Sequence, residues 1–134
     1  MRILLLTHYW APEVGAPQRR WNRLAEALIS RGHELAVLAP APHYPGGRLL
    51  QGGGAHMAGS IRRDVTGAMV HRTIFRPYGN AVCGRGVDQM VTAADSVRLG
   101  VARFRGGNRP DVILGSVPGL PTLPAALAVG RVLH

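Results

Sequence analysis

The residues best suited to chemistry lie just before and within the first turn of the first predicted helix. Pro17 suits the first helical position, and Ala16, in the capping place, has no side-chain oxygen to accept a backbone N–H group. Several backbone amides are therefore left to bind an outside partner, and the positive end of a helix dipole favours an anion. These amides belong to Gly15, Ala16, Gln18 and Arg19.

Two adjacent arginines strengthen the case for an anion at this turn. Arg19 and Arg20 stand where the helix dipole disfavours cations by about 0.3–1 kcal/mol each. A bound anion would explain their presence, and the alternative is a pair of solvated arginines at a helix start. Arg20 lies at the flank of the apolar helix face, so we expect it, rather than Arg19, to lean into a cleft beside the sheet.

Two further turns carry candidate binding residues. His43 and Tyr44 lie in the proline-rich loop 40–47, which follows a predicted strand. The carboxyl ends of parallel strands are where open α/β sheets bind ligands, so both side chains are candidates to contact a substrate; the alternative is that they pack the turn. Ser116 follows another predicted strand and either donates a hydrogen bond to a ligand or caps the turn.

The elements that position these residues begin with a strand, helix and strand. The continuous apolar run 3–6 is typical of a parallel strand covered on both faces. Apolar residues then follow helical spacing, and Gly32 ends the helix. A second strand follows at 35–38, and such a tight succession requires a right-handed crossover. The helical stripe consists of Trp21, Leu24, Ala25, Leu28 and Ile29.

The remainder of the chain continues the α/β pattern less regularly. Segment 48–68 is glycine-rich and non-periodic, so we expect weak order there. Strands are predicted over 69–75 and 111–114, a helix of about five turns over 87–104, and a last helix over 123–133. The fold class is therefore α/β, with a Rossmann-like parallel sheet and flanking helices. Because doubly wound sheets usually have more than four strands, we expect the chain to be the front of a longer protein.

The charge balance favours anionic partners. Sixteen basic residues, all arginine, face seven acidic ones and give a net charge of +9. This suits phosphorylated substrates or an anionic membrane surface, although genomic base composition can produce the same arginine bias. The arginines are scattered without interleaved aromatics, so we expect no nucleic-acid binding.

The cysteine, the histidines and the longest uncharged span limit the kinds of site and the location that the sequence predicts. The single cysteine excludes an intramolecular disulfide, and the six histidines show no metal-ligand spacing, so no metal is expected. The uncharged span 112–130 contains three prolines and is a poor membrane-spanning helix, and no signal peptide is evident. We expect a cytoplasmic protein, with peripheral contact at the inner membrane face.

The segment THYWAPEVGAPQRRWNRLAEALISRGHELAVLAPAPHYPGGR resembles the opening of family 4 glycosyltransferases of the GT-B fold. The likeness is greatest to bacterial members that build capsule, exopolysaccharide and O-antigen sugars. It covers residues 2–48 closely and returns more weakly at 109–113 and 116–127.

This resemblance implies that residues 1–134 form an incomplete amino-terminal domain that receives the acceptor. A carboxyl-terminal domain would bind the nucleotide-sugar donor, and no cofactor or metal is needed. The family's glycine pair corresponds to Gly15 and Ala16, and the arginines after it to Arg19 and Arg20. In this subgroup the acceptor is a glycan or a lipid-linked sugar diphosphate.

The family's paired glutamates for the donor have no counterpart, since Glu13, Glu26 and Glu34 all lie in the first strand–helix–strand unit. We therefore expect the donor domain to be missing and this chain to be inactive alone.

Two other functions stay open. One is a stand-alone Rossmann-like module that binds phosphorylated ligands or a separate donor domain. The other, a nicotinamide-dependent oxidoreductase, is disfavoured because no GxGxxG follows the first strand. The acidic residue expected after the second strand is also absent, and Ala39, Pro40 and Ala41 stand there instead.

Overall fold

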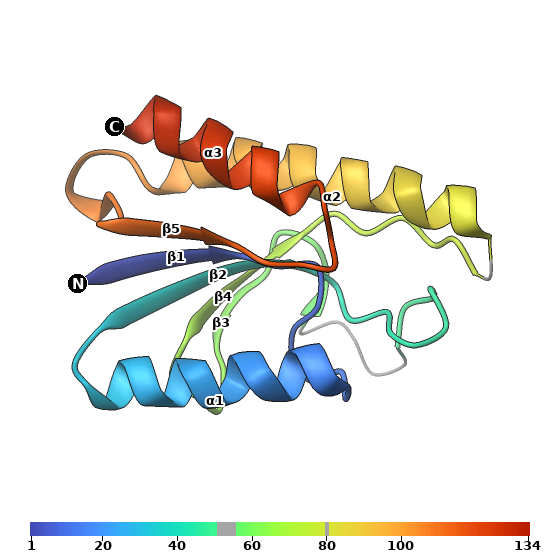
Figure 1. Cartoon of the computed structure of the whole chain (residues 1–134), viewed down its shortest axis with the longest axis horizontal. Helices are drawn as coiled ribbons and strands as arrows, with labels where there is room; N and C mark the ends of the chain where they lie inside the picture. Colours follow the sequence, from blue (N-terminus) through green and yellow to red (C-terminus); the bar gives the residue numbers. More distant parts are fainter. Residues whose placement is uncertain (51–55, 80) are drawn as a thin grey trace.

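A five-stranded sheet with helices on both faces organises the chain (Figure 1). The structure is a computed structural model that describes residues 1–50, 56–79 and 81–134. The helix α1 covers one face of the sheet, and α2 and α3 lie side by side on the other (Figure 1). The elements are β1 (Arg2–Leu6), α1 (Ala16–Ser30), β2 (Glu34–Pro40), β3 (Ile61–Arg63), β4 (Met69–Thr73), α2 (Val82–Arg103), a short 3₁₀ turn η2 (Gly106–Asn108), β5 (Val112–Gly115) and α3 (Thr122–Leu133).

The order of the strands places β1 at the point where the sheet changes its direction of growth. The strand order is β3-β4-β2-β1-β5, and all neighbours are parallel except β3, which runs antiparallel to β4. The chain builds β2 and β4 on one side of β1 and returns to place β5 on the other. In open α/β sheets the carboxyl ends of the strands beside such a switch point form the usual ligand crevice.

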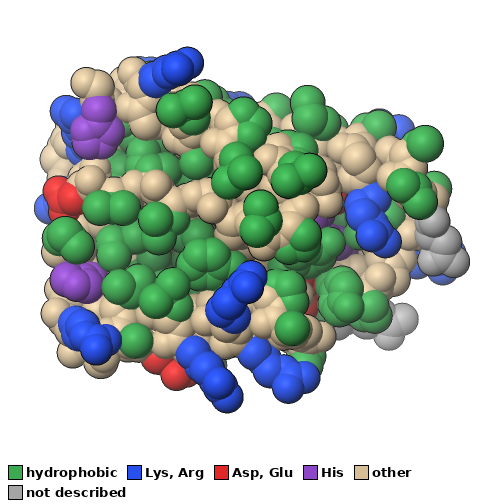
Figure 2. Space-filling model, in the orientation of Figure 1, with side chains coloured by type: hydrophobic (Ala, Val, Ile, Leu, Met, Phe, Trp, Pro, Cys, Tyr) green, Lys and Arg blue, Asp and Glu red, His purple; other side chains and the backbone are tan. Residues whose placement is uncertain are grey.

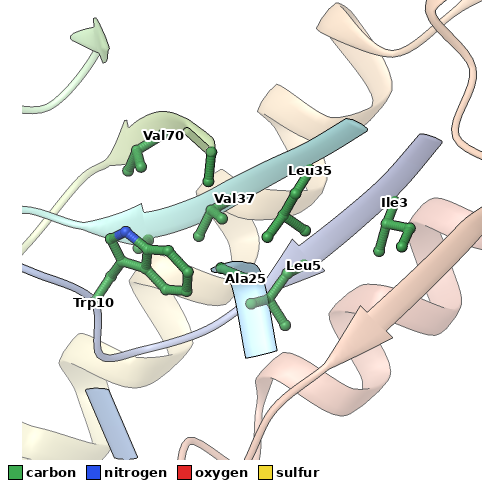
Figure 3. Close-up of a cluster of buried hydrophobic side chains, with 9 residues drawn as sticks. Ile3, Leu5, Trp10, Ala25, Leu35, Val37 and Val70 are labelled. Atoms are coloured by element: carbon green, nitrogen blue, oxygen red, sulfur yellow. The ribbon is translucent and has the colours of Figure 1, made fainter. Parts of the chain in front are cut away.

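The core under α1 is built around Trp10 (Figure 3). Its ring is 1% exposed and packs with Leu5 and Val37 of the sheet and Ala25 of the helix. The indole Nε1 donates a hydrogen bond to Asp64 Oδ2 at 2.8 Å, so the polar edge of the ring is also satisfied. The segment that follows β1 is thereby held in the core.

On the other face, α2 and α3 approach each other closely at Gly100. A Cβ atom at this position would lie 3.0 Å from Val129 Cγ2, so a larger residue would require Val129 to shift. Leu6 and Leu38 of the sheet lie in the same buried cluster as Val129. The sheet is therefore covered on both faces, which explains the continuous apolar runs of β1 and β2.

The first strand–helix–strand unit is confirmed with small corrections. Gly15, rather than Ala16, is the N-cap residue of α1, and no side chain caps the helix. Gly32, with a φ of 80°, follows the helix end, in the region that favours glycine. Leu24 is 40% exposed, so it does not belong to the buried face of α1. The helix α2 begins at Val82, five residues before the predicted start at Val87.

The prediction of weak order over 48–68 is wrong in part, and its residues 51–55 lie outside the described residues. Strand β3 adds an antiparallel edge to the expected parallel sheet. The turn between β3 and β4 is held by Asp64 Oδ1, which accepts hydrogen bonds from the Thr66 amide at 2.9 Å and the Ala68 amide at 3.2 Å. All three β3 residues are exposed, so they carry no apolar pattern that the sequence could reveal.

At the other edge of the sheet, β5 has no strand partner beyond β1 within residues 1–50, 56–79 and 81–134. Hydrophobic side chains gather over β5 and α3 on the face seen in Figure 2, while basic side chains stand along the side of α1. Val112 is 36% exposed and Leu127 56%. In the part of the chain that is described, no helix has both the length and the apolar character needed to cross a bilayer.

Candidate functional site

Three buried polar side chains meet at the carboxyl edge of the sheet. His8 follows β1, His43 follows β2, and Asp88 lies in the first half of α2. Their exposed fractions are 1%, 0% and 0%. One nitrogen of each ring and one carboxylate oxygen lie within 4.8 Å of one another, and His8 Nε2 is 3.2 Å from Asp88 Oδ2. Buried charges and imidazoles are seldom gathered in this way without a role.

Neighbouring backbone groups hold two of these side chains by their outer atoms. Asp88 Oδ1 accepts a hydrogen bond from the Arg76 amide at 2.7 Å, and His43 Nδ1 lies 2.9 Å from the Ala41 carbonyl oxygen. Asp88 Oδ2, His43 Nε2 and both ring nitrogens of His8 have no hydrogen-bond partner among the described residues. The fold therefore orients His43 and Asp88 and leaves one polar atom of each without a hydrogen bond.

Aromatic rings enclose this cluster. The His43 ring stacks on Phe75 with centroids 4.4 Å apart and on Tyr9 at 5.6 Å. Burial lowers the pKa of His43 below its usual value, and the nearby Glu13 carboxylate opposes this only in part. Burial likewise raises the pKa of Tyr9 to about 12. His43 is thus a neutral imidazole at pH 7, with a free electron pair on one nitrogen.

Glu13, in the segment before α1, forms hydrogen bonds with the loop after β2. Its side chain is buried, and Oε1 accepts hydrogen bonds from the backbone amides of His43 at 2.5 Å and Tyr44 at 2.9 Å. Oε2 accepts a third from Gln18 Nε2 at 3.0 Å. Sequence reasoning missed this role, because a glutamate in a loop is solvated by default and nothing in its spacing marks it as buried.

The structure brings three of the predicted binding residues together: Gly15, His43 and Tyr44. A Cβ atom on Gly15 would lie 2.5 Å from Gln18 Oε1 and 3.4 Å from Tyr44 Cε1, so the glycine permits close contact between the helix start and the loop after β2. His43, the residue before Tyr44, is fully buried, while Tyr44 is 40% exposed.

The arginines of the first turn are not part of the buried cluster. Arg19 and Arg20 are both exposed, and the side chain that turns inward from this helix start is Gln18, which is 1% exposed. The prediction of a free amide is wrong for Arg19, whose N–H donates to the Gly15 carbonyl at 3.1 Å. Ala16 is the first residue of α1, and no side chain caps the helix there.

Ser116 lies on the other side of β1. Its Oγ donates a hydrogen bond to Thr7 Oγ1 at 2.7 Å, and its amide donates to the Leu6 carbonyl at 3.0 Å. The same loop places Gly119 against His8, since a Cβ at Gly119 would lie 2.8 Å from that of His8. Ser116 thus fixes the turn that covers His8.

The buried cluster was only partly predictable. His43 is a predicted site residue, whereas His8 and Asp88 lie 80 positions apart and share no motif spacing. The position of His8, two residues after a buried strand, is the one signal that could have found it, because such residues reach the carboxyl edge. Asp88 carries no comparable signal.

Comparison of the chain with known protein families, with curated proteins and with solved structures finds no match.

Proposed function

We propose that this domain is the acceptor-side half of a glycosyltransferase that transfers a sugar from a nucleotide-sugar donor to a glycan or lipid-linked acceptor in polysaccharide biosynthesis. The α/β architecture is compatible with the Rossmann-like fold that this proposal requires. The resemblance of residues 2–48 to family 4 glycosyltransferases of the GT-B fold supports it. The observation that carries it is the contact between Gly15 and Tyr44 at the uncapped start of α1.

This arrangement suits a sugar diphosphate. The first turn of α1 contains no acidic residue, and its amides receive no side-chain cap, so an anion at this end is favoured. Glu13 does not use these amides, because its oxygens are taken by His43, Tyr44 and Gln18. The half-exposed Tyr44 ring offers an apolar surface on which a sugar can pack.

The proposal is tested by titrating the chain with a water-soluble short-chain prenyl diphosphate sugar in a calorimeter. We expect binding that weakens about tenfold or more in the double variant Arg19→Gln/Arg20→Gln, since each lost charge pair near a phosphate is worth about 1 kcal/mol. Arg23→Gln is the matched control, because Arg23 is exposed on the same helix one turn later. No binding by the unaltered chain, or equal loss in the control, would contradict the proposal.

The proposal also predicts that the 134-residue chain does not transfer sugar by itself, since the paired glutamates that the family uses for the donor have no counterpart in it. Product formation from a panel of nucleotide sugars and the same acceptor analogue would be measured by mass spectrometry. Turnover by the isolated chain would contradict an acceptor-half function.

A second candidate function is a stand-alone module that binds phosphorylated ligands. The net charge of +9 and the open helix start favour it, and neither observation requires a sugar. Inorganic diphosphate distinguishes the two functions in the same calorimeter. Equal affinity for diphosphate and for the prenyl diphosphate sugar would favour the module, whereas clear preference for the latter favours the acceptor domain.

We further propose peripheral contact with an anionic membrane, where each well-placed arginine contributes about 1 kcal/mol. Arginines stand along the side of α1 (Figure 2). Sedimentation with vesicles that contain anionic lipid should show binding that weakens as salt rises. Absent or salt-independent binding would contradict this membrane contact.

A further inference from the structure

We propose that His8, His43 and Asp88 bind a divalent transition-metal ion, with zinc as the best match. This proposal is independent of the glycosyltransferase function, and it departs from the expectation that the histidines have no metal-binding role. It concerns three side chains from three separate segments: the loop after β1, the loop after β2, and α2.

The geometry of the cluster fits a coordination shell. Ligand atoms about 2.0–2.1 Å from a tetrahedral zinc ion lie about 3.3 Å from one another. His8 Nε2 and Asp88 Oδ2 are 3.2 Å apart, although they form no aligned hydrogen bond. All three ligand atoms lie within 4.8 Å of one another, so the wider of these separations must shorten when the three side chains bind one ion.

The outer contacts of His43 and Asp88 are those expected of metal ligands. A ligating histidine usually donates its other ring N–H to a carbonyl or carboxylate, which fixes the ring and its tautomer. His43 has this arrangement, because Nδ1 faces the Ala41 carbonyl and Nε2 is free. Asp88 is likewise held through Oδ1 by the Arg76 amide, which leaves Oδ2 for the ion.

The charge of the site also calls for a cation. Asp88 is fully buried, and a buried carboxylate is strongly unfavourable unless a positive charge or several donors compensate it. Its one ion-pair partner within the described ranges is His8, which is itself 1% exposed. A divalent ion would compensate Asp88 without requiring a charged imidazole.

The donor set selects the class of metal. Two imidazole nitrogens and one carboxylate oxygen suit zinc and other late first-row ions better than magnesium or calcium, which prefer oxygen ligands. Three protein ligands leave one tetrahedral position for a water molecule. Since all three side chains are buried, the ion would tie together the segments that form the carboxyl edge of the sheet.

Cobalt(II) is the first probe, because its visible spectrum reports coordination. After treatment with a chelator, the chain should bind one Co²⁺ with the intense absorption of a four- or five-coordinate site, and Zn²⁺ should displace it. Adventitious surface histidines would instead give weak octahedral bands, which would overturn the proposal. Zinc-edge X-ray absorption of the unaltered protein should show two imidazole ligands and one or two oxygen ligands.

Matched variants identify the ligands. Asp88→Asn and His43→Gln should each lower the affinity for Co²⁺ at least tenfold and abolish the rise in melting temperature that Zn²⁺ causes. His71→Gln is the buried control and His33→Gln the surface control, and both should retain the affinity. Circular dichroism establishes that each variant is folded. If a ligand variant does not fold, the spectra of the unaltered chain decide; loss of the metal in a control but not in a folded ligand variant would overturn the proposal.

Discussion

The two ends of the same sheet are built in opposite ways. At the carboxyl edge, four buried titratable side chains meet: His8, Glu13, His43 and Asp88. At the amino edge lies a cavity of about 570 Å³, lined by residues that include Arg2, Glu34 and His71. The ion pair there, between Arg2 and Glu34 at 3.5 Å, has side chains that are 50% and 80% exposed.

The difference shows that this cavity and the buried cluster of titratable side chains lie at opposite edges of the sheet. An exposed ion pair is screened by water and costs little to keep. The carboxyl edge holds groups whose burial must be compensated by hydrogen bonds or charge.

The largest expected effect on stability concerns the two glutamates. Glu13→Ala should lower the free energy of unfolding by about 3 kcal/mol, because it leaves the buried amides of His43 and Tyr44 without an acceptor. Glu34→Ala, at the amino edge, should change it by less than about 0.5 kcal/mol. Urea denaturation measures both, and similar losses would remove the contrast between the edges.

Substitutions of two glycines, one at each edge of the sheet, should have a smaller effect on stability. Gly119→Ala should cost about 2 kcal/mol, because the new Cβ would lie 2.8 Å from His8 Cβ. Gly107→Ala, at the amino edge, meets no atom within 4 Å among the described residues and should be almost neutral. The difference in thermal unfolding midpoint between these variants is the measurement. A neutral Gly119→Ala would mean that the loop over His8 is loosely held.

The smallest effect is a dependence of stability on pH at the amino edge. Burial, with a further contribution from Arg103, lowers the pKa of His71 from 6.5 to about 4. Between these values the unfolded chain binds a proton that the folded chain does not, so this group makes stability fall as the pH drops from 6.5 to about 4. His71→Gln should reduce that fall by about 1 kcal/mol, since solvent reaches part of the ring.

Denaturation at several pH values would measure this reduction. His43→Gln should also flatten the profile, since burial lowers the pKa of His43 in the same direction. A profile unchanged by His71→Gln would show that the pKa of His71 is not lowered in the folded state.

The fold was largely predictable where local pattern and tertiary position agree. The continuous apolar run of β1 and the spaced stripe of α1 are signals that burial imposes directly on the sequence. Strand β3 escaped prediction because its register depends on the Asp64 turn and on β4, and its own three residues are exposed.

The site was less predictable, for a topological reason. His43 could be inferred from its place after a strand, but its partners His8 and Asp88 are selected only when β1, β2 and α2 pack together. Glu13 is similar, because its buried state depends on the loop that carries His43 and Tyr44. Sequence periodicity reports which face of an element is buried, and it does not report which distant polar residues meet there.

Of the two edge strands of the sheet, only β5 is suited to pairing with a further strand. Strand β3 is short and carries Arg62 and Arg63, which oppose the addition of another chain. Strand β5 has no such charge and exposes apolar side chains nearby. A parallel strand joining this sheet would therefore align beside β5, and its carboxyl end would emerge next to Gly115, on the same edge as His8. Any extension of the sheet would thus enlarge the edge that already gathers the buried polar residues.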